Sequence, residues 1–544
     1  MTRLFDLLYH QLENFPLEKS LNGRDSSGSW KSYSSKDIAD KAEKLASGLL
    51  SLGLQPGEKV SMVVYKNRPE WLILDFAIQM AGLISIPLYP TISVGEYEYI
   101  LNEAEVKAAF CGGGDLYDKL FATQKNVTTL KNIYTLDRRK ELPFWEDLFD
   151  TENFDRLEEI KGQIKGEDLA TIIYTSGTTG NPKGVMLQHS NIMHIVTETS
   201  DLLKIKNGEN ALSFLPLCHI YERTVSFSYY FKGVSVYFCG TDNLSGPDGD
   251  LASVNPVLFT TVPRLLEKIY EAIYNKGLAL DGAKRKLFFW ALALTDNYEI
   301  DQKKSFGQRI QWKIADKLIF SKWREALGGN IRMIITGAAP CPVKVLRVFC
   351  AAGINVREAY GLTETSPTLT GNTMEPDGTL LGTVGYAIKG VELLIDSSEG
   401  EYKPGEGEIL AYGPNVMLGY YKKPNVNEKI FKTIDGKKWF CTGDIGQLII
   451  GPGGREFLKI TDRKKELLKT SGGKYVAPAP IENRIREEFL VEQMMVIGDK
   501  QKFVSALIVP AEEALKSYCE KKEISWTSLE DIVTHKKVIK RFQK

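Results

Sequence analysis

Apolar runs typical of buried strands alternate with helical segments between residues 45 and 336 of this 544-residue chain. Parallel strands need long crossover connections, which are usually helices, so this alternation restricts the fold to a layered α/β arrangement. The pattern predicts doubly wound parallel sheets. Strands are expected at 59–65, 83–88, 169–174, 184–188, 211–215, 235–239 and 331–336, and helical segments at 45–53, 70–80, 191–203 and within 264–327.

The sequence changes character after Glu364. Glycines become frequent, and short β-rich runs stand at 391–395, 408–411 and 447–450. Charged residues follow Thr461, and exposed polar segments mark domain junctions. We therefore predict a large N-terminal part at 1–461, with a small β-structure near 365–461, and a smaller α+β domain at 462–544.

Charge and cysteine content argue against several classes of protein. Lys plus Arg and Asp plus Glu both total 69, so nothing indicates an electrostatic nucleic-acid partner. The seven cysteines lack CxxC spacing, which fits a reduced interior better than a disulfide framework or a zinc site. No signal pattern and no run of about 18–20 apolar residues is present. We expect a soluble cytoplasmic protein and leave peripheral contact with the inner face of the membrane open.

One polar loop separates two of the expected strands, at 174–184, with the sequence Tyr-Thr-Ser-Gly-Thr-Thr-Gly-Asn-Pro-Lys-Gly. Glycines let successive backbone N–H groups form an anion-binding nest, and the hydroxyls and Lys183 add donors and a positive charge. A kinase-type loop needs G-x-x-x-x-G-K-[ST], but here Pro182 and Gly184 flank the lysine. Composition alone leaves a solvated surface turn open, whereas the residue types favour a loop that holds a polyphosphate.

The order of residues in this loop resembles the phosphate loop of the adenylate-forming superfamily, which includes acyl-CoA synthetases. Further stretches resemble the family's later motifs in the same order, so that the resemblance extends from about Tyr33 to the low 500s. These stretches are FLPLCHIYER at 214–223, YGLTE at 360–364, WFCTGDIG at 439–446, ITDRKKE at 460–466 and SGGKYVAP at 471–478. The first and the last two of these stretches resemble the long-chain fatty acid–CoA ligase branch.

The resemblance implies two doubly wound α/β subdomains and a small β-barrel, followed by a small mobile C-terminal domain. It also implies a reaction in which a fatty acid carboxylate attacks the α-phosphate of ATP, releasing pyrophosphate and giving acyl-AMP. The thiol of coenzyme A then displaces AMP. The expected ligands are therefore ATP, Mg²⁺, coenzyme A and a long-chain fatty acid.

Side-chain chemistry and the resemblance together predict individual roles. Lys183 is expected at the β- and γ-phosphates, and Glu364 at Mg²⁺, because this ion prefers carboxylate oxygen. The resemblance also implies that Thr175 lies near the metal and that His219 orients the reacting carboxylate. The predicted ATP ligands are Thr175, Ser176, Gly177, Thr178, Thr179, Lys183, Gly337, Ala338, Ala339, Tyr360, Gly361, Thr363, Asp444 and Arg463.

The nucleoside is expected to meet a second set of residues. Tyr360 has an aromatic face for the adenine, and the small residues 337–339 allow backbone to approach the base. Asp444 can accept hydrogen bonds from both ribose hydroxyls, although stabilisation of its own turn is the alternative. Arg463 resembles the family arginine that reaches the nucleotide.

The last motifs carry the predicted thioester-forming groups. Lys465 occupies the hinge position, and Lys469 is expected to support thioester formation. Gly472 and Gly473 leave space for the pantetheine arm of coenzyme A. Each of these lysines is explained nearly as well as a solvated surface residue.

Several points stay open from the sequence. Glu222 and Arg223 either pair with each other or line the site. Apolar candidates for an acyl tunnel, which a plain core explains equally well, are Phe227, Tyr229, Tyr230, Phe231, Phe259 and Val262. The family's C-terminal adenylation lysine has no match before the chain ends at Lys544, so the C-terminal domain is expected to be incomplete. The alternatives are a nucleotide- or acyl-binding protein with impaired turnover, an acyl–carrier-protein ligase and an ATP phosphotransferase. The sequence determines neither the length of the acyl chain nor the oligomeric state.

Overall fold

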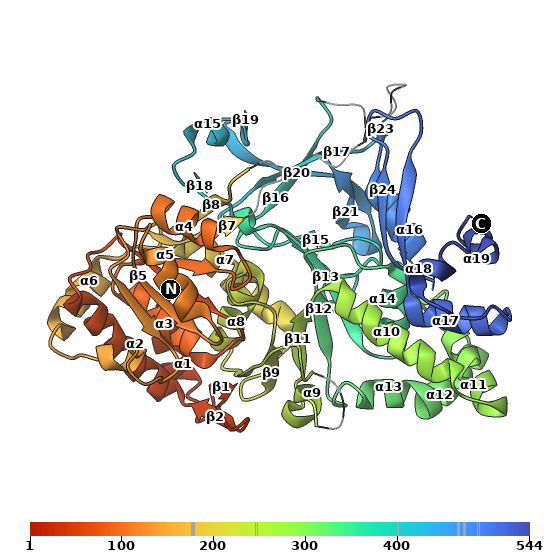
Figure 1. The fold of residues 1–544 in the computed structure, drawn as a ribbon, viewed down its shortest axis with the longest axis horizontal. Helices are drawn as coiled ribbons and strands as arrows, with labels where there is room; N and C mark the ends of the chain where they lie inside the picture. The colour runs from red at the N-terminus through yellow and green to blue at the C-terminus, as the bar shows by residue number, and fades with distance from the viewer. Residues whose placement is uncertain are drawn as a thin grey trace. The chain divides into compact units, whose positions relative to one another are not determined.

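The computed structural model describes residues 1–175, 180–244, 246, 248–399, 402–464, 468–469, 471, 475–486, 488 and 490–543. The chain divides into two compact units (Figure 1). The first comprises Met1–Leu394, Leu410–Thr442 and Ile449–Leu458, and the second comprises Ile395–Ile409, Gly443–Leu448 and Lys459–Lys544. The domain boundary predicted between residues 461 and 462 stays a prediction.

A seven-stranded sheet forms one half of the first unit. Its order is β18 (Gly419–Tyr420), β8 (Lys183–Gln188), β7 (Leu169–Thr175), β4 (Ile84–Leu88), β3 (Lys59–Val64), β5 (Val106–Gly112) and β6 (Asn132–Thr135). The strands from β7 to β6 pair in parallel, whereas β8 pairs antiparallel with both β7 and β18. Its accompanying helices are α2 (Ser35–Ser51), α3 (Pro69–Met80), α4 (Val94–Glu103), α5 (Leu116–Gln124) and α6 (Phe154–Gln163).

A nine-stranded sheet forms the other half. Its order is β15 (Tyr386–Ala387), β14 (Thr370–Gly371), β13 (Asn355–Tyr360), β12 (Met333–Thr336), β11 (Leu258–Thr261), β9 (Asn210–Ser213), β10 (Ser235–Phe238), β1 (Leu21–Arg24) and β2 (Trp30–Tyr33). The central strands are parallel and both edges are antiparallel. Its helices are α8 (Ile220–Phe231), α9 (Asp250–Val254), α10 (Pro263–Leu278), α11 (Gly282–Ala293), α12 (Phe306–Ala315), α13 (Ser321–Glu325) and α14 (Val343–Ala351). Helix α1 (Asp6–Asn14) contacts α2 and α8, and α7 (His189–Thr199) contacts α8 and β8 of the seven-stranded sheet.

The predicted α/β class with doubly wound sheets is confirmed, and the short strands after residue 365 add detail to it. Three of them extend the two large sheets, as β14, β15 and β18. The others form a five-stranded sheet of β16 (Glu392–Asp396), β17 (Gly407–Tyr412), β20 (Lys437–Ile450) and β19 (Phe431–Ile434), with β21 (Glu456–Arg463) on β20. The glycine-rich sequence therefore contributes strands to three sheets.

The second unit ends in small α+β elements. Two hairpins pair β22 (Leu468–Lys469) with β23 (Tyr475–Val476) and β24 (Val491–Ile497) with β25 (Ser505–Pro510). The helices are α16 (Pro478–Arg486), α17 (Glu512–Lys521), α18 (Leu529–Ile532) and α19 (Lys536–Phe542). Leu515, Cys519 and Val538 belong to a small apolar cluster of their own. In the described part of the chain, no helix combines the length and hydrophobicity that membrane crossing requires.

Helices α3 and α8 form a shared layer between the two large sheets. Helix α3 contacts β3 and β4 of one sheet and β1 of the other, while α8 contacts β9 and β10. Every residue of α3 is buried, as expected for a helix that is apolar on most faces. The Phe76 ring packs against Phe227 and Tyr230 of α8 at centroid distances of 5.6 and 5.4 Å.

A buried ion pair crosses this helix layer. Arg223 of α8 donates from Nε and Nη2 to both carboxylate oxygens of Asp75 on α3, at 2.8 and 2.6 Å. Its remaining hydrogen bonds reach the hydroxyls of Thr171 on β7 and Ser85 on β4, both at 3.0 Å. All four residues are fully buried. One guanidinium therefore connects two helices and two strands.

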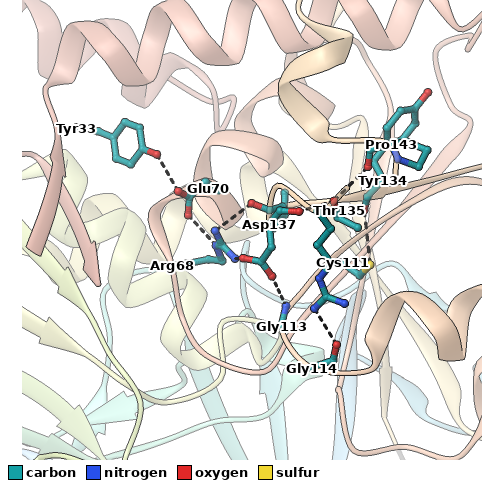
Figure 2. A network of polar contacts seen from close by, with 12 residues as sticks. Tyr33, Arg68, Glu70, Cys111, Gly113, Gly114, Tyr134, Thr135, Asp137 and Pro143 are labelled. Atoms are coloured by element: carbon teal, nitrogen blue, oxygen red, sulfur yellow. Dashed lines mark hydrogen bonds and ion pairs between the residues drawn. The ribbon is translucent and has the colours of Figure 1, made fainter. Parts of the chain in front are cut away.

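A second polar network holds the start of α3 against the ends of β5 and β6 (Figure 2). Arg68 donates to Glu70 at 2.8 Å and to Asp137 at 2.7 Å, and Asp137 accepts the backbone N–H of Gly113 at 2.7 Å. The Tyr33 hydroxyl donates to Glu70 at 2.8 Å. Burial favours the neutral acid, but Arg68 and these hydrogen bonds hold the pKa of Glu70 below its ordinary value. These contacts hold the carboxyl ends of β5 and β6 against the start of α3.

The buried pair gives a stability prediction. Asp75→Asn should destabilise the first unit by about 3–5 kcal/mol, because it leaves the Arg223 charge buried without a counter-ion. The double variant Asp75→Leu/Arg223→Met should recover most of this loss, since it removes both desolvated charges. Urea unfolding followed by tryptophan fluorescence measures the effect.

A surface pair provides the control. Asp201 pairs with Lys232 at 2.7 Å, but its side chain is 84% exposed, so Asp201→Asn should change stability by less than about 1 kcal/mol. Equal unfolding midpoints for Asp75→Asn and Asp201→Asn would contradict the role given to the buried pair.

Candidate active site

A pocket of about 280 Å³ lies at the carboxyl ends of β4 and β7 in the first unit. Open α/β sheets bind their ligands at this edge. Three predicted site residues, Thr175, His219 and Thr363, line the pocket together. Its other lining residues are Pro87, Leu88, Tyr89, Ile92, Glu96, Ile100, Ile173, Tyr174 and Pro182. The pocket thus combines an apolar wall with a few polar groups, as small-molecule sites commonly do.

The two ends of the predicted phosphate loop come together beside this pocket. Strand β7 ends at Thr175 and β8 begins at Lys183, and these two residues are register partners of the antiparallel pair. The prediction that the loop joins strand to strand is therefore confirmed. The predicted ligands Ser176, Gly177, Thr178 and Thr179 lie outside the described residues.

Tyr420 of β18 connects Lys183 with Glu364. Its hydroxyl donates to Glu364 Oε1 at 2.6 Å, and Lys183 Nζ lies 5.4 Å from the centroid of its ring. Burial, and then the Glu364 carboxylate, raise the pKa of the phenol far above its ordinary value, so Tyr420 remains a hydrogen-bond donor. The lysine and the carboxylate, predicted separately from distant motifs, therefore meet at one tyrosine.

Sequence reasoning missed Tyr420. It stands next to Gly419 and Tyr421 in a run that carries no distinctive chemical pattern. Its position depends on the pairing of β18 with β8, in which Tyr420 is the register partner of Val185. The missing signal was therefore a long-range strand pairing.

His219 is the N-cap residue of α8 and lies in the pocket wall. Its Nδ1 accepts the backbone N–H of Tyr221 at 3.2 Å. Burial lowers the pKa of the imidazole below its ordinary value, so the ring is neutral at pH 7. A neutral ring whose Nδ1 accepts carries its proton on Nε2. His219 can therefore offer one N–H donor to an oxygen atom of a ligand.

The predicted adenine residues gather at neighbouring strand ends. Gly337, Ala338 and Ala339 follow β12, and Tyr360 ends β13, which pairs with β12 in parallel. Ala338 has a φ of +67°, so the chain turns sharply at this point. A Cβ atom on Gly361 would meet the carbonyl oxygen of Pro367 at 1.7 Å, which explains the glycine beside Tyr360.

Glu358 supports this turn and was not found from the sequence. It lies two residues before Tyr360 on β13, and its carboxylate accepts the backbone N–H of Cys341 at 3.2 Å. Burial raises the pKa of Glu358 to about 8, although the Cys341 N–H opposes the shift. The carboxyl group thus connects the segment after residues 337–339 to β13.

Glu222 and Arg223 neither pair with each other nor line the pocket. Arg223 bonds Asp75, as described above, whereas Glu222 accepts a hydrogen bond from the Thr260 hydroxyl. Burial raises the pKa of Glu222 to about 7, although the hydroxyls of Ser213 and Thr260 lower it. Successive residues on a helix point about 100° apart, which separates the two side chains.

Most of the proposed tunnel residues belong to the core. Phe227, Tyr229, Tyr230 and Phe259 are fully buried within the hydrophobic clusters of the first unit. None of the six candidates lines the pocket described above. Its apolar wall comes instead from β4, β7 and the region of α4.

The second unit contains two further predicted residues. Arg463 Nε donates to Asp444 Oδ1 at 3.1 Å, and Asp444 is 4% exposed. Beside them, Lys464 pairs with Glu408 at 2.7 Å. Lys469 belongs to β22, and its side chain is not among those described. The predicted hinge Lys465 and the predicted coenzyme A residues Gly472 and Gly473 lie outside the described residues.

Comparisons with known proteins were made for the whole chain. Residues 8–421 match the AMP-binding enzyme family, and residues 465–542 match the AMP-binding enzyme C-terminal domain. Long chain acyl-CoA synthetase 6, peroxisomal, of Arabidopsis thaliana is 33% identical over 530 residues, which cover 94% of this chain and 72% of the relative. Long-chain-fatty-acid–CoA ligase 6 of Homo sapiens is 34% identical over 545 residues, covering 93% and 73%.

Solved structures share the fold. The anthranilate CoA ligase AuaEII in complex with anthranoyl-AMP superposes with a TM-score of 0.70 at 18% identity, covering 96% of this chain and 91% of that one. ATP-bound MatB from Rhodopseudomonas palustris gives a TM-score of 0.68 at 24% identity, covering 94% and 89%. At these identities the likeness concerns the fold alone.

The protonation of His219 can be tested by NMR. Burial lowers its pKa below the ordinary 6.5, so the imidazole should be mostly neutral at pH 7 and should gain its second proton at lower pH than an ordinary histidine. In protein labelled at histidine, the signal that is absent from His219→Gln should have a titration midpoint below that of an ordinary histidine.

His189 provides the internal comparison. Burial lowers its pKa to about 4, so the signal that is absent from His189→Gln should titrate well below the pH at which an ordinary histidine does. A titration midpoint of the His219 signal at or above pH 6.5 would contradict the neutral donor described here.

Proposed function

Because this chain belongs to the AMP-binding enzyme family, we propose that it is a ligase that activates a long-chain fatty acid as acyl-AMP and transfers the acyl group to coenzyme A. The carboxylate oxygen attacks the α-phosphorus of ATP, and the bond to pyrophosphate breaks. The thiol then attacks the acyl carbon, and AMP leaves. ATP, Mg²⁺ and coenzyme A are the required small molecules.

One observation carries this proposal. The pocket lined by Thr175 and His219 lies at the end of the strand that leads into the phosphate loop, and the loop returns at Lys183. An acid placed in this pocket would have its carboxylate beside the phosphates held by the loop. Such placement is what an in-line attack on phosphorus requires, since positioning supplies much of the rate.

The residues around Tyr420 fit a magnesium nucleotide. Mg²⁺ is commonly held by one or two carboxylates together with substrate phosphates. Glu364 offers one carboxylate, oriented by the Tyr420 hydroxyl at 2.6 Å, and Thr175 adds a hydroxyl. The described residues contain no cluster of three or more metal-ligating His, Cys, Asp or Glu side chains, which fits an ion held largely by phosphates. When bound, the ion would neutralise phosphate charge, while Lys183 contacts the β- and γ-phosphates.

His219 would orient the acid rather than act as a base. A carboxylate is already ionised at pH 7 and has no proton to lose. The Nε2–H of the neutral imidazole can donate to one carboxylate oxygen, which leaves the other free to attack. Because Nδ1 is held by the Tyr221 N–H at 3.2 Å, the ring has a defined orientation.

The remaining predicted roles complete the proposal. Tyr360, Gly361 and Thr363 with residues 337–339 would hold the adenosine, and Asp444 the ribose hydroxyls. Arg463, which donates to Asp444, would reach the nucleotide. Later in the chain, Lys465 would serve as the hinge, Lys469 would support thioester formation, and Gly472 and Gly473 would receive pantetheine.

The proposal extends to location and to the thiol acceptor. We place the enzyme in the cytoplasm with peripheral contact at the inner face of the membrane, because a long-chain fatty acid partitions into bilayers. An acyl–carrier-protein ligase would use the same adenylation step with another thiol. Product analysis with coenzyme A and with a carrier protein separates these two acceptors.

Pyrophosphate exchange tests the adenylation step. Exchange of label between pyrophosphate and ATP should depend on a long-chain carboxylate and should fall by roughly 100-fold or more in Lys183→Ala and in Glu364→Gln. The first change removes the cation at the β- and γ-phosphates, and the second removes the carboxylate charge that would hold Mg²⁺. The surface variants Lys140→Ala and Glu141→Gln, at exposed positions, should retain wild-type exchange. Release of ADP in place of AMP, or exchange without a carboxylate, would overturn the proposed reaction, and binding of ATP without AMP formation would favour a binding protein.

Tyr420→Phe tests the link between Tyr420 and Glu364. Loss of the hydroxyl should raise the Mg²⁺ concentration needed for half-maximal exchange by about tenfold, because the carboxylate is no longer held in position. Tyr421→Phe, which changes the neighbouring tyrosine, is the matched control. An unchanged Mg²⁺ dependence in Tyr420→Phe would show that Tyr420 does not position the carboxylate.

A further inference from the structure

Helix α12 exposes a row of apolar side chains to solvent. Phe306 is 79% exposed, and Ile310 and Ile314 are 45% and 44% exposed. Leu318, in the π-helical turn η3 (Asp316–Phe320) that continues α12, is 41% exposed. Residues four apart lie on one face of a helix, so these four side chains form a continuous row, here called the α12 stripe.

The stripe is not the surface that attaches the helix to the protein. Ala315, Ile319, Phe320 and Trp323, from the same helical segment, are buried in the cluster that covers the nine-stranded sheet. Figure 1 shows α12 with α11 and α13 at the margin of the first unit. The segment is therefore apolar on two faces, of which one is packed and the other is exposed.

A row of cations runs beside the stripe. Arg309, Lys313 and Lys317 each follow a stripe residue by three positions and are all exposed. Among the described residues, these three side chains make no ion pair. Residues 302–322 contain six Lys or Arg and one Asp, although the whole chain has a formal charge of zero. This one acidic residue, Asp316, pairs with Arg324 at 2.7 Å, so it does not neutralise the cation row.

We propose that the α12 stripe and its cation row dock on an anionic lipid bilayer. An interfacial helix lies in the membrane plane with its apolar face below the headgroups, while adjacent Lys and Arg reach the phosphates. Each basic residue near an anionic surface adds to the electrostatic attraction. This inference rests on the proposed function. A long-chain fatty acid partitions into bilayers, so an enzyme docked on a bilayer meets its substrate there.

The cation row favours a membrane over a second copy of the chain as the partner of the α12 stripe. A symmetric dimer formed through the stripe would bring identical surfaces together. Arg309, Lys313 and Lys317 of both copies would then lie close to one another, and like charges oppose association. Anionic headgroups instead neutralise the row while the acyl chains cover the apolar side chains.

Vesicle sedimentation with the full chain tests this surface. The probes are vesicles of phosphatidylcholine alone and of phosphatidylcholine with phosphatidylglycerol at about three to one. Each sample is also assayed for ligase activity on a dissolved medium-chain acid, which needs no membrane. The test variants are Phe306→Ser/Ile310→Ser/Ile314→Ser and Arg309→Gln/Lys313→Gln/Lys317→Gln. The matched controls, at exposed positions on or after α5, are Phe121→Ser and Lys125→Gln/Lys131→Gln/Lys140→Gln.

The wild type and both controls should bind the anionic vesicles, and each test variant should bind them about tenfold or more weakly while keeping its activity on the dissolved acid. High salt should reproduce the effect of the charge variant. Vesicle binding without any ligase activity would support the surface and overturn the proposed function. Equal binding by wild type and both test variants, or a dimer in sedimentation velocity that the serine variant abolishes without any vesicle binding, would overturn the membrane surface.

Discussion

The ion pair of Arg223 with Asp75 is the interaction on which the geometry of the candidate site depends. Arg223 lies one helical turn after His219, whose carbonyl accepts its backbone N–H at 3.2 Å. The same guanidinium bonds Thr171 on β7, the strand that ends at Thr175. The pair therefore holds the helix that carries the pocket histidine against the strand that leads into the phosphate loop. Buried ion pairs add little net stability, but they strongly disfavour alternative arrangements in which either charge loses its partner.

Local patterns were sufficient to predict the fold class and the main loop. Strands β3, β4 and β7 are short apolar runs between turn residues, and the hydroxyl-rich loop follows β7 directly, so each could be recognised within about ten residues of sequence. The meeting of Lys183 with Glu364 could not be predicted from the residues themselves. It depends on Tyr420, which reaches the site only because β18 pairs with β8. No local pattern records a pairing between segments so far apart in the chain.

Burial was the other property that sequence could not supply. Glu222 and Arg223 are neighbours of opposite charge, and a mutual pair was a reasonable hypothesis. The helix instead directs Glu222 to Thr260 and Arg223 to Asp75, because both sides of α8 are enclosed. For the same reason, aromatic residues of α8 pack in the core, whereas the pocket takes its apolar wall from the other sheet. Protein cores and ligand pockets are lined by the same apolar residue types, so only the packing in the structure distinguishes a core from a pocket.

At the protein surface, α12 is a second case in which the sequence does not reveal which apolar residues are buried. In the segment that runs from α12 through α13, Ala315, Phe320 and Trp323 pack in the cluster that covers the nine-stranded sheet, and the exposed apolar residues of the α12 stripe interrupt the polar side of the segment. From sequence, such a helix resembles an ordinary core element, and no basic amphipathic segment stands out. Once the structure assigns Phe320 to the core and Phe306 to solvent, the cations at Arg309, Lys313 and Lys317 acquire an apolar row beside them. The combination of adjacent apolar and cationic rows, rather than either alone, is what matches an anionic bilayer.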